Sequence, residues 1–414
     1  MVTPQIGDAF GQERALGLTC RLLKDAGHEV FLVADRKAGA LPPNDGALLV
    51  PGLSSQHTLT SPSVIRQSNQ AVLHFVASKK TQIVHLHDCF DFRLLHSLGK
   101  SYATLLTAHT ISATCPSGAR LTSNSTPCSH TSGWGCIPHH YSQKCLDFLK
   151  TDLHRAHAIH SYLLRRRALR AHLRFVLAPS EYVESTFIAD GWAPDQIRRV
   201  PNPLVWPESP RKIEGAPSPL FVFAGRITPL KGLETLLQAL AALKDRQWRL
   251  WVCGEGSESE TMKALTAELG LSRRVRFWGR TDPDLTQRIL ATASAVIAPN
   301  RGPETFGLTV AEACAMGTPV VTARIPALDE WIHQGVTGQV FPPGDAFELA
   351  QRLEFVLDHP EIVNAWAVTA QRWARSLFSQ DAHLESTLAA YSAALGLESV
   401  SESRNFSTRR VPSH

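Results

Sequence analysis

Hydrophobic positions along the chain follow two alternating patterns. Short, nearly continuous apolar runs are typical of strands that are covered on both faces. Between them lie segments with helical spacing, such as Ala15–Asp25, Leu233–Lys244 and Ser257–Glu268. The strand-like runs are Val30–Ala34, Ile83–Leu86, Thr104–Thr107, Phe175–Ala178, Leu220–Phe223, Leu250–Cys253 and Val296–Ala298. Strands that alternate with helices predict parallel sheets built from βαβ units.

A proline-rich segment interrupts this alternation. Residues 201–218 include five prolines, which cannot continue a helix or a central strand, and a new strand–helix series starts after them. We therefore predict an α/β protein with one domain over 1–200, a linker over 201–218 and a second domain over 219–380. A helix is expected over 381–397 and a frayed tail over 398–414.

The beginning of the chain departs from the usual pattern of such domains. Only four residues, MVTP, precede the first predicted turn and helix and are left for a strand. The sequence therefore predicts either a very short first strand or a start codon assigned too far downstream.

Length and composition narrow the class of protein. A chain of 414 residues with 43% hydrophobic and 19% charged residues is typical of a globular protein with two domains. A net charge of +5 is too small for its length to indicate nucleic-acid binding. The sequence has no apolar run of about 18 residues and no secretion signal at its start, so we expect a cytoplasmic protein.

The second domain opens with a candidate anion site. A strand ends at Gly225 and is followed by Arg226, Lys231 and Gly232, and then by a helix. Two cations beside a helix N-terminus are suited to a diphosphate, although a turn with solvated charges would read the same way. The next strand runs into Gly254 and Gly256, a weaker sign of close ligand approach. The Walker and dinucleotide-binding glycine patterns are absent, which argues against a P-loop or nicotinamide enzyme.

Two glutamates follow a later strand of the same domain. Glu304 precedes a predicted helix that starts near Gly307, and Glu312 lies on that helix among small apolar residues. A carboxylate in such surroundings needs hydrogen-bond donors, and sugar hydroxyls are donors. The first helical turn offers free amides between the two carboxylates. This spacing predicts a ligand with hydroxyls at both ends and a diphosphate between them, such as a nucleotide sugar.

These residues resemble glycosyltransferase family 4, the retaining group 1 enzymes of GT-B fold. The family's Gly-Arg-x4-Lys-Gly pattern is met from Gly225 to Gly232, and its Glu-x7-Glu pattern by Glu304 and Glu312. Similar first-domain landmarks are Ala26–Val30, Val84–Asp88, Leu106–His109 and Ala178–Val183. The resemblance implies two Rossmann-like, doubly wound domains that face a central cleft, with the helix over 381–397 packed back on the first domain.

The resemblance also implies an activity, which is retaining transfer of a sugar from a nucleotide-diphosphate sugar to a glycan or lipid-linked acceptor in cell-surface polysaccharide or lipopolysaccharide synthesis. Cations would replace a metal at the leaving diphosphate, so no cofactor or metal is expected to be required. The implied catalytic residues are His109, Arg226, Lys231 and Glu304. The implied donor-binding residues are Gly11, Gly225, Gly254, Gly256, Phe306, Gly307, Leu308 and Glu312. A GT-B-fold epimerase and a non-catalytic nucleotide-sugar-binding protein are the alternatives.

Four cysteines lie close together in the sequence of the first domain. Cys115, Cys128, Cys136 and Cys145 fall in an insertion over 110–146. Their thiolates are suited to structural zinc, with His130, His139 and His140 as substitutes, but the spacing contains no CxxC pair. Zinc, plain buried thiols and a redox bridge all remain open at this point.

Two further segments have alternative interpretations. Leu163–Phe175 has the pattern of a helix with Arg166, Arg170 and Arg174 on one face, which is suited to an anionic membrane surface or to solvent. Asp282 and Asp284 have the form of a metal-binding DxD motif, but we expect Asp282 to be a helix cap.

Overall fold

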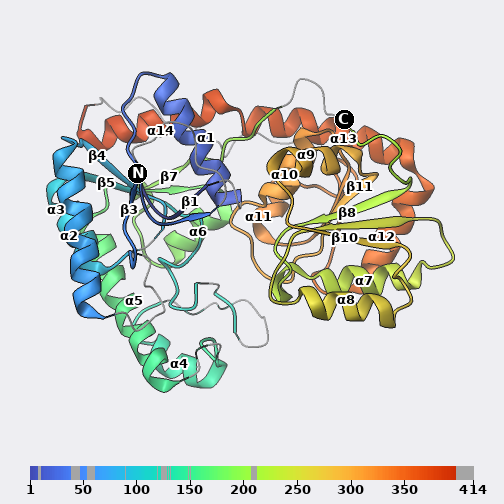
Figure 1. The fold of residues 1–414 in the computed structure, drawn as a ribbon, viewed down its shortest axis with the longest axis horizontal. Helices are drawn as coiled ribbons and strands as arrows, with labels where there is room; N and C mark the ends of the chain where they lie inside the picture. The colour runs from blue at the N-terminus through green and yellow to red at the C-terminus, as the bar shows by residue number, and fades with distance from the viewer. Residues whose placement is uncertain are drawn as a thin grey trace. The chain divides into compact units, whose positions relative to one another are not determined.

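The computed structural model contains two compact units, each built around one parallel sheet. It describes residues 1–7, 11–38, 47–53, 61–88, 90–118, 120–122, 128, 130, 132–147, 149, 151–206 and 212–397. The N-terminal unit comprises Met1–Pro203 and the chain from Gln380 onward, and the C-terminal unit comprises Leu204–Ser379. Helices flank both sheets (Figure 1). The predicted α/β class with two doubly wound domains is thus confirmed, whereas the facing cleft stays a prediction.

The N-terminal sheet has seven strands in the order β3-β2-β1-β4-β5-β6-β7, and all neighbouring pairs are parallel. Its strands are β1 (Val2–Gly7), β2 (Val33–Ala38), β3 (Leu48–Leu49), β4 (Ile83–Leu86), β5 (Ala103–Thr107), β6 (Phe175–Ala178) and β7 (Ile197–Arg199). Its helices are α1 (Gly11–Asp25), α2 (Pro62–Ser78), α3 (Phe92–Ser101), α4 (Cys136–Gln143), α5 (Asp152–His172) and α6 (Glu181–Ala189), with a 3-10 turn at Pro194–Gln196. The strand order reverses between β1 and β4, which makes this the switch point of the sheet.

The first strand corrects one expectation. β1 has six residues and extends to Gly7, beyond the four residues allotted to it, and it pairs with both β2 and β4. Polar residues such as Thr3 and Gln5 hide the strand from a search for apolar runs, yet both are buried. The strand predicted over Val30–Ala34 likewise begins later, at Val33.

The arginine-rich helix also differs from its prediction. α5 ends at His172, so Arg174 lies outside it and Phe175 opens β6. Arg166 and Arg170 do not form a free face, because both bind the buried carboxylate of Asp190. The Nε atom of Arg166 lies 3.2 Å from its Oδ2. Two of the three arginines predicted to form a cationic face are therefore paired with a carboxylate of their own domain.

The C-terminal sheet has six strands in the order β10-β9-β8-β11-β12-β13, again all parallel. Its strands are β8 (Leu220–Ala224), β9 (Arg249–Cys253), β10 (Val275–Gly279), β11 (Ala295–Ala298), β12 (Val320–Ala323) and β13 (Gln339–Phe341). Its helices are α7 (Leu233–Ala242), α8 (Ser259–Glu268), α9 (Pro283–Thr292), α10 (Leu308–Ala315), α11 (Pro326–Asp329), α12 (Ala346–Asp358) and α13 (Pro360–Leu377), with a 3-10 turn at Pro229–Lys231. Here the order reverses between β8 and β11.

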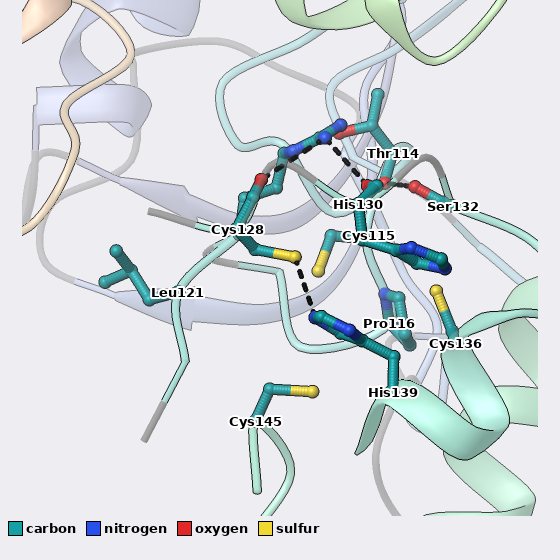
Figure 2. A pocket seen from close by; sticks show the side chains of 11 residues that line it. Thr114, Cys115, Pro116, Leu121, Cys128, His130, Ser132, Cys136, His139 and Cys145 are labelled. Carbon is teal, nitrogen blue, oxygen red and sulfur yellow. Dashed lines mark hydrogen bonds between the residues drawn. The ribbon is translucent and has the colours of Figure 1, made fainter. Parts of the chain in front are cut away.

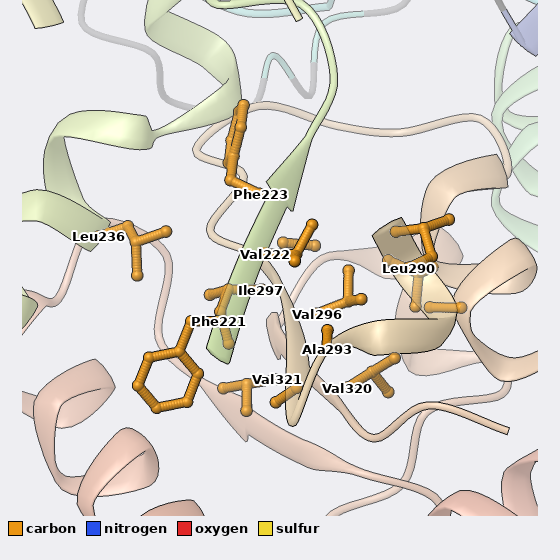
Figure 3. Close-up of a cluster of buried hydrophobic side chains, with 14 of the residues drawn as sticks. Phe221, Val222, Phe223, Leu236, Leu290, Ala293, Val296, Ile297, Val320 and Val321 are labelled. Carbon is orange, nitrogen blue, oxygen red and sulfur yellow. The ribbon is translucent and has the colours of Figure 1, made fainter. Parts of the chain in front are cut away.

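The core of the C-terminal unit explains the apolar strand sequences. Side chains of β8 alternate between its two faces, and Phe221 and Val222 point to opposite sides (Figure 3). Leu236 of α7 and Leu290 of α9 belong to the same buried cluster. In Figure 1, α7 and α8 lie on one side of this sheet and α9 and α10 on the other. The strands are therefore covered on both faces, as their composition predicts.

The last described helix, α14 (Gln380–Leu395), belongs to the N-terminal unit, where it packs against α1 and β5. His383 lies 2.9 Å from the Oγ1 of Thr19 and 2.8 Å from the carbonyl oxygen of Pro201. Tyr391 lies 2.7 Å from the Nδ1 of His85. The chain thus passes from one unit to the other after Pro203 and returns after Ser379. No helix in the described part of the chain is long and apolar enough to cross a membrane.

Candidate functional site

The loops at the switch point of the C-terminal sheet bring together residues from two strands. Gly225 follows β8, and Gly232 is the N-cap residue before α7, with a φ of +67°. A Cβ on Gly232 would collide with the carbonyl of Pro299, which follows β11. Glycine at this position therefore allows the loop carrying Arg226 and Lys231 to lie directly against the loop carrying Glu304.

The glycines after β9 have a similar packing role. Gly254 has a φ of +134°, and a Cβ there would collide with the carbonyl oxygen of Gly225. A Cβ on Gly256 would collide with the carbonyl oxygen of Ile227. Both positions were predicted to bind the donor, and their observed contacts hold the loop after β8 in place.

Lys231 and Glu304 form an ion pair at this switch point, 73 residues apart in the sequence. The Nδ2 of Asn300 donates to the Oε1 of Glu304 over 2.7 Å, and Asn300 is buried. Burial, followed by the neighbouring charge of Arg226, lowers the pKa of Lys231 to about 8. The structure thus gathers three predicted residues, Arg226, Lys231 and Glu304. Asn300 was missed, and its place just after a strand is the signal that the sequence offered.

Helix α10 begins where the sequence predicts. Gly307 precedes it with a φ of +82°, and Glu312 lies half-buried on the helix among buried alanines. The first amides of a helix have no partner inside it, and those around Leu308 lie at the end of α10 where the helix dipole favours an anion. Phe306 is different, because its ring is buried against Trp331 and Phe378. Only the backbone of Phe306 is left to serve the predicted donor role.

A second group of predicted residues lies in the N-terminal unit. His109 follows β5 and its Nε2 lies 2.9 Å from the Nδ1 of His87, which follows β4. Burial and then the charge of His383 lower the pKa of His109 to about 4, so its imidazole is neutral at pH 7. Burial is also the main reason why the pKa of His87 lies well below its usual range. One ring therefore donates and the other accepts.

Sequence reasoning missed His87 as a partner of His109. The segment Val84–Asp88 was recognised as a landmark, but no role was assigned to His87, which comes directly after β4. His85 is indeed buried, between Tyr391 and Thr107. The remaining predicted residue, Gly11, opens α1, whose Gln12 donates to the carbonyl oxygen of His87 over 3.0 Å. Gly11 has no side chain, so the donor role predicted for it rests on its backbone alone.

The four cysteines of the insertion surround one small cavity of about 20 Å³ (Figure 2). His130 and His139 also line it. Burial, followed by the charges that the other cysteines would carry, raises the pKa of Cys145 to about 11. In the described part of the chain, no group of three or more His, Cys, Asp or Glu side chains is placed so that it could hold a metal ion.

The aspartate of the DxD-like segment has the predicted structural role. Asp282 caps α9 by accepting from the amide of Leu285 over 2.8 Å.

Solved structures define the class of this fold. The chain is similar to Anabaena HepE in complex with UDP and glucose, with a TM-score of 0.66 and 18% identity over 95% of this chain and 100% of that one. It is similar to WaaG, a glycosyltransferase involved in lipopolysaccharide biosynthesis, with a TM-score of 0.67 and 18% identity over 94% and 98% of the two chains. The two parallel-sheet domains therefore have the GT-B fold.

Family models identify the chain more closely. The model for Glycosyltransferase Family 4 matches residues 11–204, and that for Glycosyl transferases group 1 matches residues 207–373. Together the two models match most of the chain, which therefore belongs to the group 1 glycosyltransferases of family 4. It is 34% identical over 164 residues to D-inositol 3-phosphate glycosyltransferase of Corynebacterium efficiens. That match covers 37% of this chain and 38% of the relative, so the chain spans about two fifths of the length of this curated relative.

Proposed function

We propose that the protein is a retaining glycosyltransferase whose C-terminal domain binds a nucleotide-diphosphate sugar. The observation that carries this proposal is the meeting of Arg226, Lys231 and Glu304 at the switch point of the C-terminal sheet. Ligands of open parallel sheets bind at such points, beyond the carboxyl ends of the strands. Two cations and one carboxylate at this place match a ligand that has both phosphates and hydroxyls.

The ion pair supports a role for both partners in donor binding. A diphosphate next to Lys231 would compete with Glu304 for the ammonium group. Glu304, held by Asn300, would then accept hydrogen bonds from sugar hydroxyls. Negative charge grows on the leaving diphosphate as the glycosidic bond breaks, and Arg226 and Lys231 would stabilise it. In this proposal the two cations perform the task of a metal ion, and no metal or cofactor is required.

The remaining donor contacts are proposed for α10 and the glycine loops. The amides near Phe306, Gly307 and Leu308 would bind the β-phosphate, since they open a helix. Glu312 would bind the ribose hydroxyls. Anabaena HepE is described in complex with UDP and glucose, which supports UDP as the first nucleotide to try.

His109 of the N-terminal domain is proposed to contact the reacting sugar. Its ring is neutral at pH 7, so it can donate a hydrogen bond without adding positive charge near an oxocarbenium-like centre. We assign no nucleophilic residue, because retention in this proposal rests on family resemblance rather than on a placed carboxylate.

The proposed acceptor is a glycan or a lipid-linked sugar used in cell-surface polysaccharide or lipopolysaccharide synthesis, met at the cytoplasmic face of a membrane. The support is the fold shared with WaaG, a glycosyltransferase of lipopolysaccharide biosynthesis. Incubating the protein with radiolabelled donor and defined oligosaccharide or lipid-linked acceptors, followed by linkage analysis, tests acceptor class and retention together.

The first experiment is a measurement of thermal stability with UDP, GDP, ADP, CMP and NAD. A ligand at a hundred times its dissociation constant adds about 2.7 kcal/mol to the free energy of unfolding. We expect UDP or GDP to raise the Tm by several degrees, and Lys231→Ala to abolish the rise. A shift with NAD alone would contradict the proposal.

The same incubation with donor and acceptors distinguishes the transferase from the two alternatives. Nucleotide binding with release of nucleotide but no transfer to any acceptor, and with a changed sugar configuration, would favour an epimerase. Binding without turnover would favour a nucleotide-sugar-binding protein.

A further inference from the structure

The cysteine-lined cavity of the insertion is not used by the proposed reaction. Its cysteines come from separate stretches of chain. Cys115 and Cys128 precede α4, Cys136 opens it and Cys145 follows it. His139 lies on α4 itself. Figure 2 shows these labelled side chains arranged around the same small space. At about 20 Å³, this space has room for a single small particle, such as a water molecule or a metal ion.

The four thiols differ from the cysteines of the domain cores. Cys20, Cys253 and Cys314 are buried, as is usual for a cysteine that acts as a small hydrophobic residue. The insertion cysteines are only half-buried and face one another, and none of the described cysteines is in a disulfide. Half-exposed thiols that gather in a loop are therefore not explained by core packing.

One pair in the cluster already has the spacing of two zinc ligands. The Sγ of Cys128 lies 3.3 Å from the Nε2 of His139. Zn–S and Zn–N bonds of about 2.3 and 2.0 Å at a tetrahedral angle place the two ligand atoms roughly 3.5 Å apart. The lining includes thiols and imidazoles but no carboxylate, which favours zinc over magnesium or calcium. The buried Nε2 of His130 bonds to no described residue.

We propose that the insertion binds one structural Zn²⁺ in a tetrahedral site. Cys128 and His139 are two of the ligands, and two of the thiolates of Cys115, Cys136 and Cys145 complete the set. Since no three of the described side chains are yet placed to hold a metal, the remaining thiols must rotate toward the Cys128–His139 pair on binding. Each thiol that binds releases its proton to solvent. The ion would fasten a segment in which α4 is the only helix that the structure describes between β5 and α5.

The test measures zinc in the full chain, purified with reductant and zinc and then dialysed. We expect about one zinc per chain by mass spectrometry of the metal, and its loss from Cys128→Ser and from His139→Gln. Cys253→Ala, a cysteine of the other unit, should keep its zinc. Retention of zinc by His139→Gln would overturn the ligand set.

A second measurement does not depend on how the variants fold. After zinc is removed with a chelator, Co²⁺ should give the intense visible absorption of a tetrahedral ion and a near-ultraviolet thiolate-to-cobalt band. A wild-type protein with no bound metal whose thiols all titrate freely would overturn the proposal in favour of plain thiols. Loss of two titratable thiols without metal would overturn it in favour of a redox bridge. None of these readouts depends on glycosyl transfer.

Discussion

At the scale of single residues, Lys231 is a cationic side chain whose surroundings disfavour its positive charge. Its side chain is 29% exposed, and burial and Arg226 lower its pKa to about 8 even though Glu304 is its ion-pair partner. The ion pair with Glu304 opposes this shift without cancelling it. A lysine near neutral pKa takes up a proton when an anion arrives. Donor binding should therefore be coupled to protonation.

The first prediction concerns this coupling. Between about pH 8 and 9, diphosphate binding should raise the pKa of Lys231, so UDP should bind with net proton uptake and affinity should fall as pH rises. Calorimetry in two buffers of different ionisation enthalpy measures the uptake. Lys231→Arg keeps its charge and should remove the uptake, since arginine does not titrate here. Equal uptake in both proteins would exclude Lys231 as its source.

The second prediction concerns His87, which the structure places beside His109 over 2.9 Å. Under the proposed function it is a positioning residue that fixes the His109 ring. A net hydrogen bond contributes about 1 kcal/mol, equivalent to about fivefold in rate. We expect His87→Ala to lower kcat by roughly that factor with little change in KM.

A conservative variant provides the control for this prediction. His87→Asn keeps a hydrogen-bonding side chain and should recover part of kcat. An unchanged kcat in His87→Ala, with His109→Ala inactive, would show that His109 does not need this contact.

At the scale of elements, glycines decide whether the loops at the switch point can meet. Gly254 and Gly270 both have positive φ angles, +134° and +72°. They differ in their surroundings, because a Cβ on Gly254 would collide with the backbone of Gly225, whereas a Cβ on Gly270 meets nothing within 4 Å. They differ also in backbone region, because the φ of Gly270 is close to the left-handed region and that of Gly254 lies well outside it.

The third prediction follows from this difference. Gly270→Ala should lower the free energy of unfolding by about 1 kcal/mol through its positive φ alone. Gly254→Ala should lower it by roughly 2 to 3 kcal/mol more, since its φ lies outside the left-handed region and the neighbouring backbone must move. Denaturant unfolding of both variants measures the difference. Equal losses would mean that the loop after β8 relaxes freely.

The sequence predicted these elements well where their signal was local. Apolar runs mark β8 and β11, and Gly307 marks the start of α10. Both signals are visible within a few consecutive residues. β1 was underestimated because its Thr3 and Gln5 are polar yet buried, a result of tertiary packing. His87 gains its role from His109, which follows another strand, and spacing along the chain does not reveal this contact. Asn300 bonds to Glu304 of its own loop, but the site that they form is completed by Lys231 from the loop after β8.

At the scale of the whole molecule, four histidines whose pKa values are lowered mainly by burial lie in one unit. His85, His87, His109 and His383 all belong to the N-terminal unit, and burial is the main cause that lowers the pKa of each. In the unfolded chain they titrate near pH 6.5. The unfolded state thus binds more protons than the folded state between about pH 6.5 and 4, so stability falls as pH falls through this range.

The fourth prediction is selective acid unfolding. For His383, whose folded pKa is about 4, the loss between pH 6.5 and 4 is about 3 kcal/mol. Hydrogen exchange at pH 7 and near pH 4.5 should show the N-terminal unit opening first. His383→Gln removes one titrating group and should flatten the pH dependence. Earlier opening of the C-terminal unit would contradict the prediction.

The return of the chain to its first unit after Ser379 has a consequence for synthesis on the ribosome. The C-terminal unit is continuous in sequence and can fold as soon as its last strand and helices have emerged. The N-terminal unit, although translated first, lacks α14 until the whole C-terminal unit has been synthesised. Until then it also lacks Tyr391 for His85 and His383 for Thr19. The second half of this protein is therefore expected to finish folding before the first.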